Sequence, residues 1–246
     1  MQHRSKKIKK SFFIILVVLI VLSGGSAIYL SNYYHSVDVE KYMNGSSEVS
    51  VEKFDKGWFF DGAGEEKALI FYPGAKVATE AYAPLMYQLA ESGIDCFLVD
   101  MPFHMAFFGM NRAEEIMQEY NYEAWYLGGH SLGGAMAANF AADYVEDHTD
   151  GIRGLLLLAA YPTKDLSTSD MSVVTIYGSE DGVLNMDKIV AGRELMPQDY
   201  KEVCVEGGNH AQFGSYGAQR GDGTAAISAE EQWARTVEVF VGDESE

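Results

Sequence analysis

The stretch Gly129-His130-Ser131-Leu132-Gly133-Gly134 stands between a strand-like run, 124–128, and a helix-like run, 132–145. Glycine lacks a Cβ atom, so the glycines on both sides of Ser131 allow the chain to reverse tightly from a strand into a helix. Such a turn holds the serine hydroxyl beyond the end of the sheet, close to the free amides of the helix start. Two interpretations stay open on this pattern alone: Ser131 is a nucleophile, or Ser131 caps the helix.

A nucleophilic serine needs a base, because its hydroxyl is unreactive near neutral pH, and the base needs a carboxylate that fixes its tautomer. In a sheet with this kind of turn, the order along the chain is Ser, then Asp or Glu, then His. Of the six histidines, His210 alone meets this order, since the others precede Ser131 or lie at the end of the helix that Ser131 opens. We therefore predict His210 as the base, with a solvated loop histidine as the alternative.

The acid is expected on the loop after the preceding strand, which ends at Tyr177. This loop, 178–183, carries two adjacent carboxylates, Glu180 and Asp181. We predict that Asp181 orients His210. Glu180 stays an alternative, because a turn can direct either carboxylate inward, and both residues are also common in ordinary turns.

A tetrahedral intermediate also needs hydrogen-bond donors for its negative charge. The amide of Leu132, at the predicted helix start, supplies one donor. The second is expected from the loop after the first central strand, where Pro73 has no amide hydrogen and Gly74 permits the turn. We predict the backbone amides of Ala75 and Leu132 as the oxyanion hole.

The loop 103–110 follows the predicted strand 95–100 and is unusually apolar for a connection between elements. Because that strand ends at the same edge of the sheet, Met105, Phe107 and Phe108 are candidates for the lining of a substrate pocket. Packing beneath a helix is the alternative.

Neither a metal nor a cofactor is predicted. Asp222 lies among glycines, but too few oxygen ligands are spaced around it for a known calcium loop. The Cys and His residues do not show the spacing of a zinc site. The two cysteines, Cys96 and Cys204, each lie in an apolar strand-like run, and we predict both as buried free thiols.

Strand-like and helix-like segments alternate along the body of the chain. The strand-like segments are 67–72, 95–100, 122–128, 154–160, 173–177 and 201–205, preceded by a hairpin within 49–60. The helix-like segments are 79–92, 112–120, 132–145, 187–195 and 228–241. This alternation predicts an α/β fold with a mostly parallel sheet and helices on both faces. Ser228 and Glu231 match a capping box at the start of the last helix.

These motifs resemble the α/β-hydrolase fold superfamily, through Gly129-His130-Ser131-Leu132-Gly133, the Gly178-x-x-Asp181-x-Val183 loop and Gly208-Asn209-His210. The resemblance covers about residues 50–241 and implies the α/β-hydrolase fold. The short core is similar to a compact bacterial branch that includes dienelactone-hydrolase-like proteins, although dienelactone hydrolases proper use a cysteine where this chain has Ser131. Only about ten residues separate the strands between which many lipases of the fold carry a helical lid. The resemblance therefore implies a lidless esterase.

The first ten residues and the remainder of the chain differ strongly in charge. The net charge is −18, but five of the 18 Lys and Arg residues lie in the first ten positions. The remainder carries 13 basic against 36 acidic residues, a net charge of −23. Nucleic acid is excluded as a partner of this acidic body, because phosphate contacts need clustered Lys and Arg.

An apolar run follows the basic flank. Residues 12–22 read FFIILVVLIVL, and no charged residue occurs between Lys10 and Asp38. The segment 12–30 is close to the roughly 20 residues that a helix needs to cross a bilayer, and the basic flank should stay inside. We expect an uncleaved membrane anchor with the body outside the cytoplasm. A signal peptide cleaved near Gly25-Ser26-Ala27, giving a secreted protein, is the alternative.

The predicted organisation is a basic flank with an anchor or signal segment (1–36), a connector (37–48) and an α/β-hydrolase domain (49–246). The predicted function is a serine hydrolase that acts on small-molecule carboxylic esters, through an acyl-enzyme on Ser131. Two alternatives remain: an acyltransferase or peptidase with the same three residues, and a surface binding module that has lost activity on the same scaffold.

Overall fold

A computed structural model of the protein describes residues 18, 25, 31–148 and 151–243. The basic flank and nearly all of the predicted membrane segment, 12–30, lie outside the described residues. Within the part of the chain that the structure describes, no helix has the length and apolar character needed to cross a membrane. The chain divides into two compact units, Met1–Tyr33 and Tyr34–Glu246, and the second unit holds every element described below.

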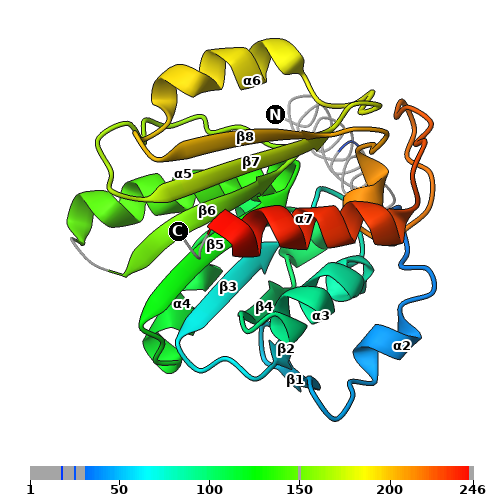
Figure 1. The fold of residues 1–246 in the computed structure, drawn as a ribbon, viewed down its shortest axis with the longest axis horizontal. Helices are drawn as coiled ribbons and strands as arrows, with labels where there is room; N and C mark the ends of the chain where they lie inside the picture. Colours follow the sequence, from blue (N-terminus) through cyan, green and yellow to red (C-terminus); the bar gives the residue numbers. More distant parts are fainter. Residues whose placement is uncertain (1–17, 19–24, 26–30, 149–150, 244–246) are drawn as a thin grey trace, which may run out of the picture. The chain divides into compact units, whose positions relative to one another are not determined.

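One eight-stranded sheet forms the centre of the second unit (Figure 1). Its strands are β1 (Ser50–Phe54), β2 (Gly57–Asp61), β3 (Lys67–Tyr72), β4 (Asp95–Val99), β5 (Ala124–His130), β6 (Ile152–Leu158), β7 (Ser172–Gly178) and β8 (Tyr200–Val205). They lie in the order β1-β2-β4-β3-β5-β6-β7-β8. The β1–β2 and β2–β4 pairs are antiparallel and all other neighbours are parallel. The prediction of a mostly parallel sheet with a hairpin at one edge is confirmed.

The helices also follow the predicted series, but the predicted helices 79–92 and 187–195 are each divided in two, and the predicted connector 37–48 contains a short helix. The α-helices are α2 (Glu40–Met43), α3 (Ala83–Glu91), α4 (Arg112–Glu119), α5 (Leu132–Asp147), α6 (Met186–Gly192) and α7 (Ala229–Asp243). Short 3-10 helices are η1 (Thr79–Tyr82), η2 (Pro102–His104), η3 (Ala106–Phe108), η4 (Arg193–Leu195) and η5 (Ala211–Phe213). The predicted helix 79–92 is divided into η1 and α3, because Pro84 has no amide hydrogen to continue the helical bonds. Ser228 caps α7 by accepting the Glu231 amide at 3.1 Å.

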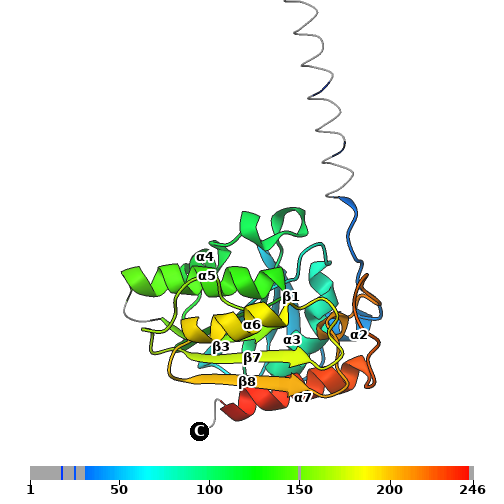
Figure 2. The same ribbon diagram turned by 90° about the horizontal axis from the view of Figure 1, so that it is seen from above.

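The central strands are buried on both faces. In β3, Leu69 and Phe71 join one apolar core cluster, while Ala68 and Ile70 join the other. Residues of α3 and α7 belong to the first cluster and residues of α4 and α5 to the second, so helices cover both faces of the sheet (Figures 1 and 2). Three small residues of α5, namely Ala137, Ala138 and Ala141, are fully buried in the second cluster.

The carboxyl ends of the parallel strands lie at one edge of the sheet. The loops after β3, β4, β5, β7 and β8 leave the sheet at that edge, and these loops together with the first residue of α5 carry every predicted site residue. Strand β8 is an edge strand, because β7 is its only neighbour among the described strands. Cys204 on β8 is consequently exposed, whereas Cys96 is buried and both are free thiols. The prediction that both cysteines are buried is wrong for Cys204.

Candidate active site

Ser131 lies at the tight turn between β5 and α5. Its backbone has φ 54° and ψ −122°, a conformation that a residue with a side chain adopts only under constraint from its surroundings. Its amide donates to the carbonyl of Leu158 on the neighbouring strand at 2.8 Å. The Ser131 side chain makes no capping hydrogen bond to α5. The capping interpretation is therefore wrong, and the hydroxyl is left for another role.

The glycines around Ser131 are required by close backbone contacts. A Cβ atom on Gly129 would lie 2.6 Å from the carbonyl carbon of Gly133. A Cβ atom on Gly134 would lie 2.6 Å from both the Gly129 oxygen and the Ala160 Cβ. Real Cβ atoms do not approach other atoms so closely, so the turn forms only with glycine at these positions.

Asp181 and His210 meet at the same edge, from the loops after β7 and β8. The Nδ1 atom of His210 lies 2.8 Å from Oδ2 of Asp181, and each side chain is only 2% exposed. The other oxygen of Asp181 accepts the amides of Val183 and Leu184, both at 2.8 Å, which fixes the carboxylate. The alternative acid, Glu180, is exposed and its side chain bonds to Ser179. Of the two carboxylates, the structure brings Asp181 to the histidine.

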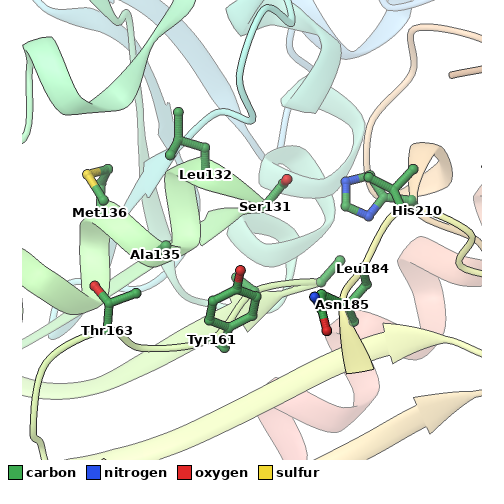
Figure 3. Close-up of a pocket in the computed structure, with 12 residues that line it drawn as sticks. Ser131, Leu132, Ala135, Met136, Tyr161, Thr163, Leu184, Asn185 and His210 are labelled. Carbon is green, nitrogen blue, oxygen red and sulfur yellow. The ribbon is translucent and has the colours of Figure 1, made fainter. Parts of the chain in front are cut away.

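The second ring nitrogen of His210 is directed into the site. Its Nε2 atom is buried and has no hydrogen-bond partner among the described residues. The Ser131 hydroxyl projects toward the His210 ring, and both residues line one cavity (Figure 3). With Nδ1 bonded to Asp181, the Nε2 atom is the one that is left to exchange a proton with the serine.

Asp222 holds the acid and base loops together, a role that the sequence did not reveal. Its Oδ1 accepts the amides of Gly182 and His210, at 3.1 and 3.2 Å, and its Oδ2 accepts the Ala211 amide at 2.8 Å. The Gly223 amide donates to Oδ1 as well, at 2.9 Å. One carboxylate therefore binds the backbone on both sides of the Asp181–His210 contact. The glycines around Asp222 are the only signal in the sequence, and they do not show where its side chain goes.

The predicted oxyanion donors lie at the start of α5 and on the loop after β3. Leu132 is the first residue of α5, where a helix amide has no partner within the helix. Ala75 lies between two residues whose amides are already bonded, since Gly74 donates to the Tyr82 hydroxyl and Lys76 to the His104 carbonyl. The loop after β3 packs closely on the turn, because a Cβ atom on Gly133 would lie 2.4 Å from the Pro73 oxygen.

The cavity that contains Ser131 and His210 has a volume of ≈ 350 Å³. Its other walls come from the first turns of α5, residues 159–163 after β6, and residues 183–185. Most of these walls are apolar, through Ala135, Met136, Ala160 and Leu184, and Tyr161 adds a phenol. Figure 3 shows Met136 and Tyr161 on the side of Ser131 away from His210.

Met105, Phe107 and Phe108, predicted as pocket residues, do not line this cavity. Phe107 and Phe108 lie on η3 and are 48% and 53% exposed, and Phe103 on η2 is 58% exposed. The rings of Phe107 and Phe108 contact one another with centroids 4.1 Å apart. The alternative of packing beneath a helix does not apply to these phenylalanines either. The role of the three predicted residues in substrate binding stays a prediction.

The connection between β6 and β7, residues 159–171, is described throughout and contains no helix. A helical lid is therefore absent from this part of the described chain, as the short spacing predicts.

Comparisons with known proteins identify a family. The model of the alpha/beta hydrolase family matches residues 68–234. In a search of curated proteins, nothing matches the chain.

Solved structures share its fold at low sequence identity. Carboxyl esterase 2 of the mycorrhizal fungus Tuber melanosporum has a TM-score of 0.59 and 12% identity, over 85% of this chain and 89% of that one. An esterase of Pyrobaculum calidifontis has a TM-score of 0.59 and 15% identity, over 84% and 88%. A monoacylglycerol lipase of Paleococcus ferrophilus has a TM-score of 0.57 and 14% identity, over 80% and 99%.

Proposed function

The chain belongs to the alpha/beta hydrolase family, and from this premise we propose that it hydrolyses carboxylic esters through an acyl-enzyme on Ser131. The observation that carries the proposal is the state of His210. One of its ring nitrogens is bonded to Asp181 at 2.8 Å, and the other is buried, without a partner among the described residues, in the cavity of Ser131. The names of similar solved structures, two esterases and a monoacylglycerol lipase, support a hydrolase of esters.

The proposed reaction begins when Nε2 of His210 removes the proton of the Ser131 hydroxyl as the oxygen attacks the ester carbonyl. Asp181 keeps the proton of the neutral ring on Nδ1 and stabilises the cation that forms. The amides of Leu132 and Ala75 donate to the carbonyl oxygen as it gains negative charge. His210 then protonates the departing alcohol, and a water molecule, activated by the same nitrogen, releases the acid from Ser131.

The cavity indicates the kind of ester. A volume of ≈ 350 Å³ with mostly apolar walls is suited to a short or medium acyl chain. The connection 159–171 contains no helix to cover the mouth. We therefore propose small-molecule esters that enter an open site.

The test is a panel of p-nitrophenyl acetate, butyrate, octanoate and laurate with the purified full chain and its Ser131→Ala variant. We expect release of nitrophenol from the shorter esters, and a loss of at least about 10³-fold in Ser131→Ala. Equal rates in the two proteins would refute the proposal. Transfer of the acyl group to an added alcohol in preference to water would instead assign an acyltransferase. An absence of any turnover would favour the binding module.

We also propose that the segment 12–30 anchors the protein in a membrane and that the catalytic unit lies outside the cytoplasm. The support is the apolar run after five basic residues, since Lys and Arg favour the cytoplasmic side. Full-length protein should sediment with membranes and resist extraction by alkaline carbonate. Recovery of a shortened chain in the medium would replace the anchor by a cleaved signal peptide.

A further inference from the structure

One buried hydroxyl connects the loop of the proposed oxyanion donor with the strand that carries the nucleophile. The Oη atom of Tyr82, the last residue of η1, lies 2.7 Å from Nδ1 of His130. The same Oη accepts the amide of Gly74 at 3.0 Å. Gly74 directly precedes Ala75, and His130 directly precedes Ser131. Tyr82 is 0% exposed and His130 is 1% exposed, so water does not compete for these contacts.

The hydrogen bonds determine where the protons lie. Because Oη accepts the Gly74 amide, its own hydrogen needs an acceptor, and Nδ1 of His130 is the one within reach. Tyr82 therefore donates to Nδ1, and the neutral His130 ring carries its proton on Nε2. Burial raises the pKa of Tyr82 far above its ordinary value, and burial is also the largest cause that lowers the pKa of His130. Both side chains are consequently neutral near pH 7.

His130 also stands against the proposed base. The ring centroids of His130 and His210 are 4.4 Å apart. The proximity of His210 is the second cause that lowers the pKa of His130. A charged imidazole at this distance would oppose the positive charge that His210 gains when it takes the serine proton. A neutral His130 leaves that step unopposed.

There is little room for this arrangement to relax. A Cβ atom on Gly74 would lie 2.8 Å from both Nδ1 of His130 and Oη of Tyr82. The Gly74 backbone thus packs directly on the two polar atoms, and a change in either side chain reaches the loop that carries Ala75.

We propose that Tyr82 and His130 are positioning residues of the active site: the Tyr82 hydroxyl holds the Gly74 amide, and through it the Ala75 donor, while it keeps a neutral His130 against His210. This inference rests on the proposed ester hydrolysis. It assigns to the residue before the nucleophile, and to a tyrosine 48 positions earlier in the chain, a role that the triad alone does not require.

The competing explanation is that Tyr82 is only a core residue, and the chain offers a matched control. Tyr72 is also fully buried, donates its hydroxyl to the Met110 carbonyl at 2.5 Å and accepts the Ala113 amide at 3.0 Å. Replacement of either tyrosine by Phe removes one donated and one accepted hydrogen bond. Only Tyr82→Phe removes them from the Gly74 loop and His130.

The first test measures kcat and KM of the full-length wild type, Tyr82→Phe and Tyr72→Phe on p-nitrophenyl butyrate. An oxyanion donor acts in the transition state, so misplacing it should lower kcat by about tenfold in Tyr82→Phe and leave KM within about twofold. We expect kcat of Tyr72→Phe within about twofold of the wild type. Equal kcat values in the two variants would overturn the inference while the proposed function stands. A wild type without turnover would refute the proposed function itself.

The second test uses His130, and its first comparison does not depend on the folding of Tyr82→Phe. His130→Asn keeps an acceptor oxygen near the place of Nδ1, whereas His130→Leu removes the acceptor and strands the Tyr82 hydroxyl. We expect kcat of His130→Asn to exceed that of His130→Leu by about fivefold. Adding Tyr82→Phe to His130→Leu should lower kcat by less than Tyr82→Phe lowers it in the wild type, because the bond between Tyr82 and His130 is already absent. Equal kcat values for His130→Asn and His130→Leu, or losses that multiply in the double variant, would overturn the inference.

Discussion

Two loops at the same edge of the sheet differ in how they are held. The turn after β5 is determined by its backbone: Ser131 has a positive φ, and the glycines beside it lie where Cβ atoms would overlap other backbone atoms. The loop after β4 also contains residues with positive φ, Phe103 and His104, but its phenylalanines are about half exposed. The first loop has one arrangement because close contacts allow no other. The second presents apolar side chains that the described chain does not cover.

This difference separates the residues on which activity should depend from those on which it should not. Contacts of the first kind position atoms to within tenths of an ångström, which the proposed chemistry needs. Replacing exposed side chains of the second kind should change the stability of the protein little. The following substitutions test the contrast.

The largest effect is expected at the acid. Asp181→Asn keeps the shape of the side chain but removes the charge that stabilises the His210 cation and fixes its tautomer, so kcat should fall by about 10³–10⁴-fold. The matched control is Glu180→Gln, in the adjacent exposed residue, which should stay within about twofold of the wild type. Steady-state kinetics on p-nitrophenyl butyrate measures both. A larger loss in Glu180→Gln than in Asp181→Asn would reverse the assignment of the acid.

A smaller effect is expected at Asp222, which bonds to backbone atoms alone. In Asp222→Asn, the new amide group faces backbone amides that also donate, so at least one of them loses its acceptor. The free energy of unfolding should fall by about 2 kcal/mol, and kcat by about tenfold as the acid and base loops separate. Urea unfolding and kinetics on the same preparation give the two values. Unchanged kcat at reduced stability would limit Asp222 to a structural role.

The pH dependence of stability should reflect His130. Its folded-state pKa lies well below the ordinary value of about 6.5, so below pH 6.5 the unfolded chain binds a proton that the folded chain does not. The stability that this group contributes is present above pH 6.5 and is lost as the pH falls, by up to about 1.4 kcal/mol for each pH unit. His130→Asn should therefore lose less stability between pH 7 and pH 5 than the wild type does. Parallel unfolding curves for the two proteins would contradict this prediction.

The smallest effect is expected on the loop after β4. Phe107→Ser and Phe108→Ser should change the free energy of unfolding by no more than about 0.5 kcal/mol, since both side chains are half exposed. They should also leave the preference for acyl length unchanged, whereas Met136→Ala, in the cavity wall, should shift it toward longer esters. Rates on the ester panel make the comparison. A shift in Phe107→Ser that matches Met136→Ala would place the phenylalanine at the substrate.

The sequence was sufficient to predict the positions of those residues whose place follows from the order of strands and helices. A strand, a glycine-rich turn and a helix predict the conformation of Ser131. The loops after two later strands, β7 and β8, predict the places of Asp181 and His210. These predictions work because the carboxyl ends of parallel strands always meet at one edge of the sheet. The family resemblance rests on the same residues, and the match over 68–234 confirms it.

The residues that the sequence did not reveal act through contacts between distant loops. Asp222 binds backbone amides on two other loops, and Tyr82 reaches His130 across 48 positions. Neither contact has a periodicity or a motif, because each depends on the final packing of the loops. The phenylalanines of 103–108 show a second limit of the sequence. An apolar composition does not determine whether a side chain faces a cavity or solvent.

The most direct test of the central claim is the site of covalent modification by a fluorophosphonate. The full-length protein is treated with the reagent and digested, and the modified peptide is identified by mass spectrometry. We predict a single adduct, on the hydroxyl of Ser131, that is absent from Ser131→Ala and forms far more slowly in Asp181→Asn. An adduct on another residue, or labelling that persists in Ser131→Ala, would contradict the account.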